Sequence, residues 1–192
     1  APMLGVFAGA LAGIFASLIF GFLTLTLLSN QVATGLALTI FGTGLSALFG
    51  LEYVGKTIEQ IEPIYIPLLT DLPFIGRILF GHDPLIYLAI GILGLTAWFL
   101  RRTRAGMVLR AVGDSDYSAH AIGYPVIAIR YAAVAFGGAM AGLGGAYLSL
   151  AYTPLWAENM SAGRGWIALA LVVFASWRPN RVLLGAILFG GI

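Results

Sequence analysis

The sequence predicts an all-α protein, a polytopic bundle of transmembrane helices, and three observations carry that prediction. Of the 192 residues, 60% are hydrophobic and only 9% are charged, whereas soluble domains are about 45–50% apolar and about 25% charged. The mean hydropathy is +0.97. Residues 1–51 contain no Asp, Glu, Lys, Arg or His, and only lipid or buried protein can surround so long an uncharged run.

The apolar runs divide the chain into spans. A helix needs about 20 apolar residues to cross a bilayer, and the runs that meet or approach this length are 3–28, 32–50, 84–100, 130–151 and 164–177, with a sixth beginning near 182. Ser29, Asn30 and Gln31 form the only polar break between the first two runs. That break is compatible with a tight turn or with an unwound stretch at membrane depth.

We expect residues 1–192 to form a single transmembrane domain of about five to six spans. The sequence lacks an initiating Met and a basic leader, and it stops inside the apolar run LLGAILFGGI. These features indicate a fragment of a longer membrane protein, truncated at both ends.

The basic residues predict the orientation of the spans. The loop 101–130 and the turn 178–181 hold seven of the ten basic residues, whereas the loops 51–83 and 152–163 hold two, Lys56 and Arg77. Because Lys and Arg concentrate in cytoplasmic loops, we expect 101–130 to be cytoplasmic and 51–83 and 152–163 to be external. A short interfacial helix is expected at residues 67–80.

Small residues recur at helical spacing in two of the spans. One ridge comprises Gly5, Gly9, Gly13, Ser17 and Gly21, and the second comprises Gly137, Gly138, Ala141, Gly142 and Gly145. Ridges of this kind let helix backbones approach closely in lipid. They predict packing within the chain or against a homologous subunit.

The composition excludes several chemical functions. The interiors of the apolar runs carry no Asp, Glu, His or Arg, since Arg130 and Arg164 stand at span ends, so neither a charge relay nor an intramembrane hydrolase is expected. There is no cysteine, and His82 and His120 are isolated, so no metal site is predicted. No phosphate loop occurs. We therefore expect no catalytic residues, no cofactor and no enzyme activity, and the basic residues indicate topology rather than nucleic-acid binding.

The polar segment 101–130 is the strongest functional signal from the residues alone. Gly113 and Asp114, with Ser115 or Asp116, form a plausible helix start, because short polar side chains cap exposed amides. A short helix over 117–122 would then lie along the membrane surface and stop at Gly123 and Pro125. Its small residues would let it enter a groove on a partner, and the alternative is an ordinary solvated loop.

The run RAVGDSDYSAHAIGYPVIAIRYAAVAFGGAMAGLGGAYLSL, residues 110–150, resembles the coupling loop and following helix of permease subunits of bacterial ABC importers. The branch is the one that serves simple sugars, nucleosides and branched-chain amino acids. Residues 158–190 and 30–45 are most similar to nucleoside-type members, although 175–177 depart from the expected Phe-Gly-basic pattern. The resemblance implies that the following residues dock on the ATPase: Arg110, Ala111, Gly113, Asp114, Ser115, Ala119, Ile122 and Gly123.

The resemblance also implies the partners and location of the chain. These are a cytoplasmic ABC ATPase that hydrolyses ATP, a second permease subunit that is identical or homologous, and an extracellular substrate-binding lipoprotein, assembled in the bacterial plasma (inner) membrane. A nucleoside is the first cargo expected, a ribose-type sugar the second and a branched-chain amino acid the third. Alternatives from other classes are a gradient-driven facilitator or channel without an ATPase, and a membrane scaffold.

A modest set of residues is available for contacts with cargo and receptor. Asn30 and Gln31 are candidates to hydrogen-bond hydroxyls or a base edge, and Phe41, Tyr147 and Trp166 are candidates for stacking or for apolar walls. Plain packing is the alternative for each. On the external side, Glu158, Asn159 and Arg164 would face the receptor or pair with one another.

Overall fold

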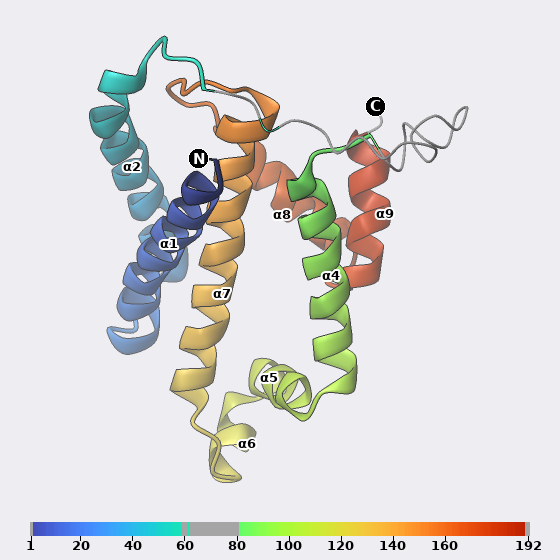
Figure 1. Ribbon diagram of the computed structural model, residues 1–192. Coiled ribbons are helices and arrows are strands. Elements are labelled where there is room, and N and C mark those ends of the chain that lie inside the picture. Colours follow the sequence, from blue (N-terminus) through green and yellow to red (C-terminus); the bar gives the residue numbers. More distant parts are fainter. Residues whose placement is uncertain (1, 59–60, 62–80, 191–192) are drawn as a thin grey trace. The chain divides into compact units, whose positions relative to one another are not determined.

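The computed structural model describes residues 2–58, 61 and 81–190, and within these ranges the chain is helical without a β-strand (Figure 1). The chain divides into two compact units. The first comprises Ala1–Gln60 and Val108–Met160, and the second comprises Ile61–Met107 and Ser161–Ile192.

The first unit begins with α1 (Pro2–Gly21), which continues as the π-helix η1 (Phe22–Thr26), and α2 (Gln31–Gly50), which ends in the 3-10 helix η2 (Leu51–Tyr53). It also holds α6 (Asp116–Ala121), α7 (Val126–Tyr147) and the π-helix η3 (Leu148–Tyr152). The second unit holds α4 (Pro84–Arg102), α8 (Arg164–Phe174) and α9 (Pro179–Gly190). Helix α5 (Arg104–Asp114) starts in the second unit and ends in the first.

Among the described residues, four helices are long and apolar enough to cross a membrane: Pro2–Thr26, Gln31–Tyr53, Pro84–Arg102 and Val126–Tyr152. The span predicted at 164–177 is wrong in length. Helix α8 has 11 residues and rises about 16 Å at 1.5 Å per residue, against a hydrocarbon core of about 30 Å. It ends because Ser176 and Trp177 take positive φ angles of 53° and 58°, which turn the chain into α9.

Two further expectations concerned the sixth apolar segment and an interfacial helix. The sixth apolar segment begins at Pro179, three residues before the predicted start, as the 12-residue helix α9. The interfacial helix expected at 67–80 lies outside the described residues.

The surface of the helices suits a lipid environment. In the described parts, the buried hydrophobic residues are Val6, Val112, Ala119, Ala146, Leu150, Ala151 and Ala175. Large apolar side chains such as Leu4, Phe15 and Ile40 are exposed instead. Because lipid tails are as apolar as these side chains, the chain needs no large internal core.

The glycine ridges of α1 and α7 pack on each other, as one of the two expected modes requires (Figure 1). A Cβ atom added at Gly13 would overlap the carbonyl oxygen of Gly138, and one added at Gly142 would overlap the carbonyl oxygen of Gly9. The backbones of α1 and α7 therefore touch directly.

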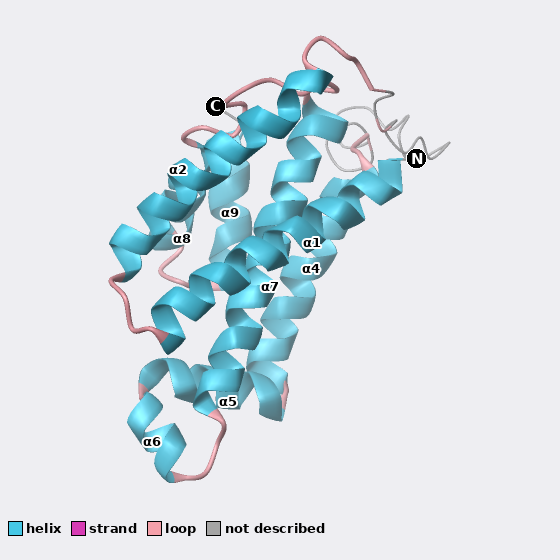
Figure 2. Cartoon of the chain, turned by 90° about the vertical axis from the view of Figure 1, so that its left-hand side faces the viewer, coloured by secondary structure: helices cyan, strands magenta, loops and turns pink. Residues whose placement is uncertain are grey.

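The order of the contacts shows that α1 and α7 are antiparallel. Gly5 lies against Leu150, Gly9 against Ala146 and Gly21 against Tyr131. The end of α1 therefore lies beside the beginning of α7, and α1 and α7 lie side by side again in the perpendicular view (Figure 2).

Residues 27–30 form a tight turn, which decides between the two expectations for the first polar break. Leu28 takes a φ of 53°, and the Ser29 hydroxyl donates to the Leu23 carbonyl at 2.7 Å. The Asn30 side chain accepts hydrogen bonds from the amides of Val32 and Ala33 at 3.0 and 3.1 Å. This cap starts α2 and turns it back beside α1.

The opposite end of the first unit is closed by two connecting segments. The Trp156 ring covers Gly50, where a Cβ atom would overlap the indole. The amide of Ile58 donates to the Pro154 carbonyl at 3.0 Å. The segment that follows α2 is therefore tied to the segment that follows α7.

In the second unit, α9 packs on α4 and on α8. The rings of Phe174 and Phe189 meet edge to face, with centroids 5.9 Å apart. A corner joins α4 to α5, where the Thr103 hydroxyl donates to the Phe99 carbonyl at 2.7 Å and accepts from the Gly106 amide at 3.0 Å. Gly106 lies so close to Phe99 that a Cβ atom there would overlap the Phe99 carbonyl.

The packing of α1 on α7 predicts opposite outcomes for adjacent glycines. Gly138→Ala should lower the free energy of unfolding by about 1–3 kcal/mol, the usual cost of overpacking, because its Cβ would overlap Ser17 and Gly13. Gly137→Ala should keep the free energy of unfolding or raise it by up to about 1 kcal/mol, since an added Cβ would meet no atom within 4 Å and alanine is favoured over glycine inside a helix. Thermal unfolding in detergent measures both, and equal melting temperatures for the two variants would contradict the packing.

Candidate functional site

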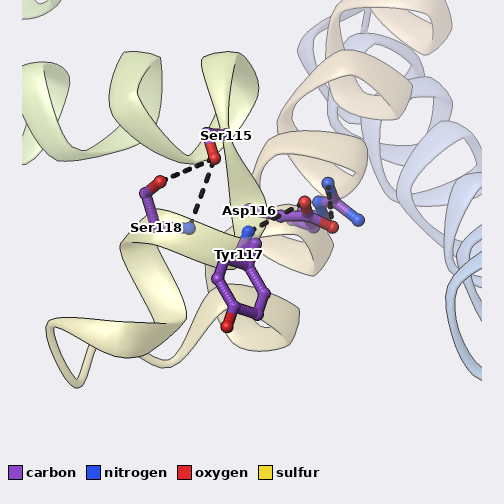
Figure 3. A network of polar contacts seen from close by, with 5 residues as sticks. Ser115, Asp116, Tyr117 and Ser118 are labelled. Atoms are coloured by element: carbon purple, nitrogen blue, oxygen red, sulfur yellow. Dashed lines mark hydrogen bonds and ion pairs between the residues drawn. The ribbon is translucent and has the colours of Figure 1, made fainter.

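The connection between α5 and α7 carries the predicted short helix in nearly the predicted place. Helix α6 runs from Asp116 to Ala121, one residue earlier than the expected 117–122. Ser115 is its N-cap: the side chain accepts from the Ser118 amide at 3.3 Å and donates to the Ser118 hydroxyl at 2.9 Å (Figure 3). Of the two expected start positions, Ser115 is therefore the one that caps.

The end of α6 is a hydrogen-bonded turn that leads directly into α7. Gly123 takes a φ of 94°, a conformation that favours glycine, and its amide donates to the His120 carbonyl at 2.9 Å. The Tyr124 amide donates to the Ala119 carbonyl at 3.2 Å. Pro125 then precedes the first residue of α7, so the expected stop at Gly123 and Pro125 is observed.

Exposure separates the residues of α6 into two groups. Tyr117 and Ile122 are 83% and 76% exposed, and the Tyr117 ring projects from the helix away from Ser115 and Ser118 (Figure 3). Ala119 is only 4% exposed. Ala119 therefore packs inside its own unit, and the accessible apolar groups on this segment are Tyr117 and Ile122.

The remaining residues of the predicted docking motif lie on the second half of α5. Arg110, Ala111, Gly113 and Asp114 are exposed, and space is open around Gly113. Between them, Val112 is buried, at 2% exposed. The motif thus follows one stretch of chain over α5 and α6 with both exposed and buried members, which we call the docking segment (residues 110–123).

An ion pair ties α6 to the first turns of α7. The Asp116 carboxylate lies 3.1 Å from the guanidinium of Arg130 and also accepts from the Tyr117 amide at 2.9 Å (Figure 3). The next residue, Tyr131, shares a hydrogen bond of 2.6 Å with the Thr26 hydroxyl of η1. One turn of α7 therefore contacts both α6 and the end of α1.

The residues expected to contact cargo belong to several elements in both units. The Asn30 side chain caps α2, and Gln31 is the first residue of that helix. On α7, Tyr147 lies about 24 Å from Tyr131, at 1.5 Å per residue. Phe41 lies midway along α2. Trp166 belongs to α8 in the second unit.

The residues expected to face a receptor follow η3. Glu158 and Asn159 are exposed in the first unit, and Asn159 takes a φ of 60°. Arg164 is the first residue of α8 in the second unit. Within the described ranges, no group of three or more His, Asp or Glu side chains is placed to hold a metal ion.

Sequence reasoning missed two features of this region. Helix α5 was not predicted, although Thr103 ahead of an apolar spacing at Gly106, Leu109 and Val112 is a usable signal for an amphipathic helix. The pairing of Asp116 with Arg130 is not readable from sequence, because it depends on the direction in which the chain leaves the turn at Gly123.

Comparison with known proteins gives a consistent set of matches. The family described as "Branched-chain amino acid transport system / permease component" matches residues 1–192. A protein of Haloferax volcanii, provisionally named a glucose ABC transporter permease protein, is 42% identical over 97% of this chain and 58% of its own length. The nucleoside ABC transporter permease protein of Lactococcus lactis subsp. cremoris is 34% identical over 98% of this chain and 61% of its own length.

A third relative, the guanosine ABC transporter permease protein of Bacillus subtilis, is 31% identical over 99% of this chain and 61% of its own length. The chain therefore spans about three fifths of the length of these relatives. No solved structure matches the chain significantly.

The cap of α6 predicts a local effect of Ser115→Ala. Loss of an N-cap costs about 1 kcal/mol, so hydrogen exchange at the amides of 118–124 should accelerate about fivefold. Ser115→Asn is the matched control, because asparagine caps equally well, and it should exchange at the wild-type rate. Unchanged protection in Ser115→Ala would show that the cap does not hold α6.

Proposed function

Because this chain belongs to the permease family of branched-chain amino acid transport systems, we propose that it forms part of the membrane-spanning subunit of an ATP-driven importer. The observation that carries the proposal is the docking segment (residues 110–123), a capped helix with exposed Tyr117 and Ile122 between two membrane-spanning helices. In this role the segment receives a cytoplasmic ATPase, and the spans form the translocation path.

The chemistry of the chain supports a division of labour with a partner. The sequence contains no phosphate loop, which is the usual cradle for ATP phosphates. Among the residues of the four described spans, the one acidic side chain is Glu52, at the end of Gln31–Tyr53, whereas a coupled ion is usually carried by ionisable residues inside the membrane. Hydrolysis of ATP is therefore assigned to the partner ATPase. A second permease subunit and an external substrate-binding lipoprotein complete the proposed assembly.

We assign the cargo to solutes that contain a sugar ring. Of the three relatives described above, the one that is 42% identical is provisionally named for glucose, and the other two are named for a nucleoside and for guanosine. Hexoses and nucleosides share hydroxyl groups on a ring, which uncharged polar side chains and backbone groups recognise. A simple sugar and a nucleoside are the first two candidates, ahead of a branched-chain amino acid.

Uptake measurements test this proposal directly. Cells that express the full-length gene with its neighbouring ATPase and receptor genes should accumulate labelled glucose, ribose, uridine or guanosine against a gradient, and a deletion strain should not. An ATPase variant that cannot hydrolyse ATP should abolish accumulation. Uptake that survives this variant and only equilibrates the solute would identify a facilitator instead.

The docking segment predicts the effect of changing Ile122. Ile122→Asp should reduce ATPase co-purification and uptake at least about tenfold, because a buried interface does not accept an unpaired carboxylate. Ile122→Leu keeps the apolar group and should retain both. The exposed Ile122 is preferred to Ala119 for this test, since a charge at the buried Ala119 would disturb folding. Normal co-purification with Ile122→Asp would place the ATPase elsewhere.

A further inference from the structure

We propose that Arg130 and Asp116 are positioning residues in energy coupling: their ion pair fixes the direction of α6 so that α6, α7 and α1 move as one body. This inference rests on the proposed function. Asp116 lies in the docking segment but not among the residues that the resemblance assigns to ATPase docking, and Arg130 lies outside the segment; both are identified by the ion pair between them.

The first step is that α6 is attached to α7 at both of its ends. At its C-terminal end, the amides of Gly123 and Tyr124 are bonded back to α6, and the Val126 amide donates to the Tyr124 carbonyl at 2.9 Å. At its N-terminal end, Asp116 reaches Arg130 at 3.1 Å. A short helix attached at one end can swing about that point, whereas attachment at both ends fixes its direction.

The second step is that the same turn of α7 holds α1. The Tyr131 hydroxyl and the Thr26 hydroxyl are 2.6 Å apart, and the Tyr131 ring packs over Gly21, where an added Cβ would lie 3.2 Å from the ring. Further along, the backbones of α1 and α7 are in direct contact at Gly13 and Gly138. A displacement of α7 therefore carries α1 with it, because packed helices deform little.

The third step concerns the strength of the ion pair. The side chains of Arg130 and Asp116 are 41% and 57% exposed, and an exposed pair contributes little to folding stability. Its loss should leave the fold and the ATPase contact intact while α6 loses its fixed direction. A movement of the ATPase would then change the direction of α6 relative to α7 and would displace α7 and α1 less.

The test uses the full-length permease with its ATPase, its second permease subunit and its receptor, reconstituted in liposomes, and measures solute taken up per ATP hydrolysed. Arg130→Gln, which lies outside the docking segment, should lower this ratio by about threefold to fivefold with normal ATPase binding, and Asp116→Asn should lower the ratio to a similar extent. Exchange of the two charges, Asp116→Arg with Arg130→Asp, should restore part of it, since arginine in the first turn opposes the helix dipole. Arg104→Gln, which removes an exposed charge from the start of α5, is the matched control and should keep the wild-type ratio.

A cross-linking experiment separates rigid movement from hinged movement. In a background without other cysteines, Asp116→Cys with Arg130→Cys should show the lowered ratio, and joining the two thiols with a short bismaleimide should raise it again. Loss of uptake on cross-linking would show that α6 must swing relative to α7, which overturns the inference.

The remaining outcomes are also decisive. A wild-type ratio in Arg130→Gln, or loss of ATPase binding in that variant, would contradict a positioning role. Absence of ATP-dependent uptake by the wild-type complex would instead refute the proposed function, so the two failures are distinguishable.

Discussion

The first unit depends on the direct contact between the backbones of α1 and α7. In lipid, apolar side chains gain little by meeting one another, so helices associate through close packing and interhelical polar contacts. Gly9, Gly13, Gly138 and Gly142 supply such packing, because any side chain at Gly13, Gly138 or Gly142 would overlap the opposite helix. The antiparallel arrangement that results places the 27–30 turn and the start of α7 at one end of the unit. The Tyr131 and Thr26 hydroxyls can then meet there.

The polar segment between α4 and α7 consists of two short helices, α5 and α6, joined by tight corners rather than of an irregular loop. Thr103 closes α4 and starts α5, Ser115 starts α6, and Gly123 at φ 94° sends the chain into α7. Each corner satisfies backbone groups that would otherwise lack partners. Short helices joined by such corners hold Tyr117 and Ile122 exposed in a defined geometry, which a solvated loop would not do. This order is the structural basis on which a role in transmitting motion is proposed for the docking segment.

Much of the helical organisation was predictable, because long apolar runs and polar breaks are local features. The limits of α6 came within one residue, since Ser115, Gly123 and Pro125 act through their own backbone conformations. The length of α8 was not predictable from hydropathy, because residues 164–177 remain apolar through the turn at Ser176 and Trp177. The capping of α2 by the Asn30 side chain was also not predicted, because composition gives no signal for it.

The sequence by itself determined that the chain is a multi-pass helical membrane protein and that small residues recur along two of its helices, and it predicted a short capped helix within the segment 110–123. These properties follow from composition, from spacing along a helix and from caps, all of which act over a few residues. Only the tertiary structure decided that the two ridges pack on each other within one chain, that Ala119 is buried while Tyr117 and Ile122 are exposed, and that Asp116 meets Arg130. Such facts depend on how a helix is rotated and where a turn directs it, and residues far apart in the sequence settle both.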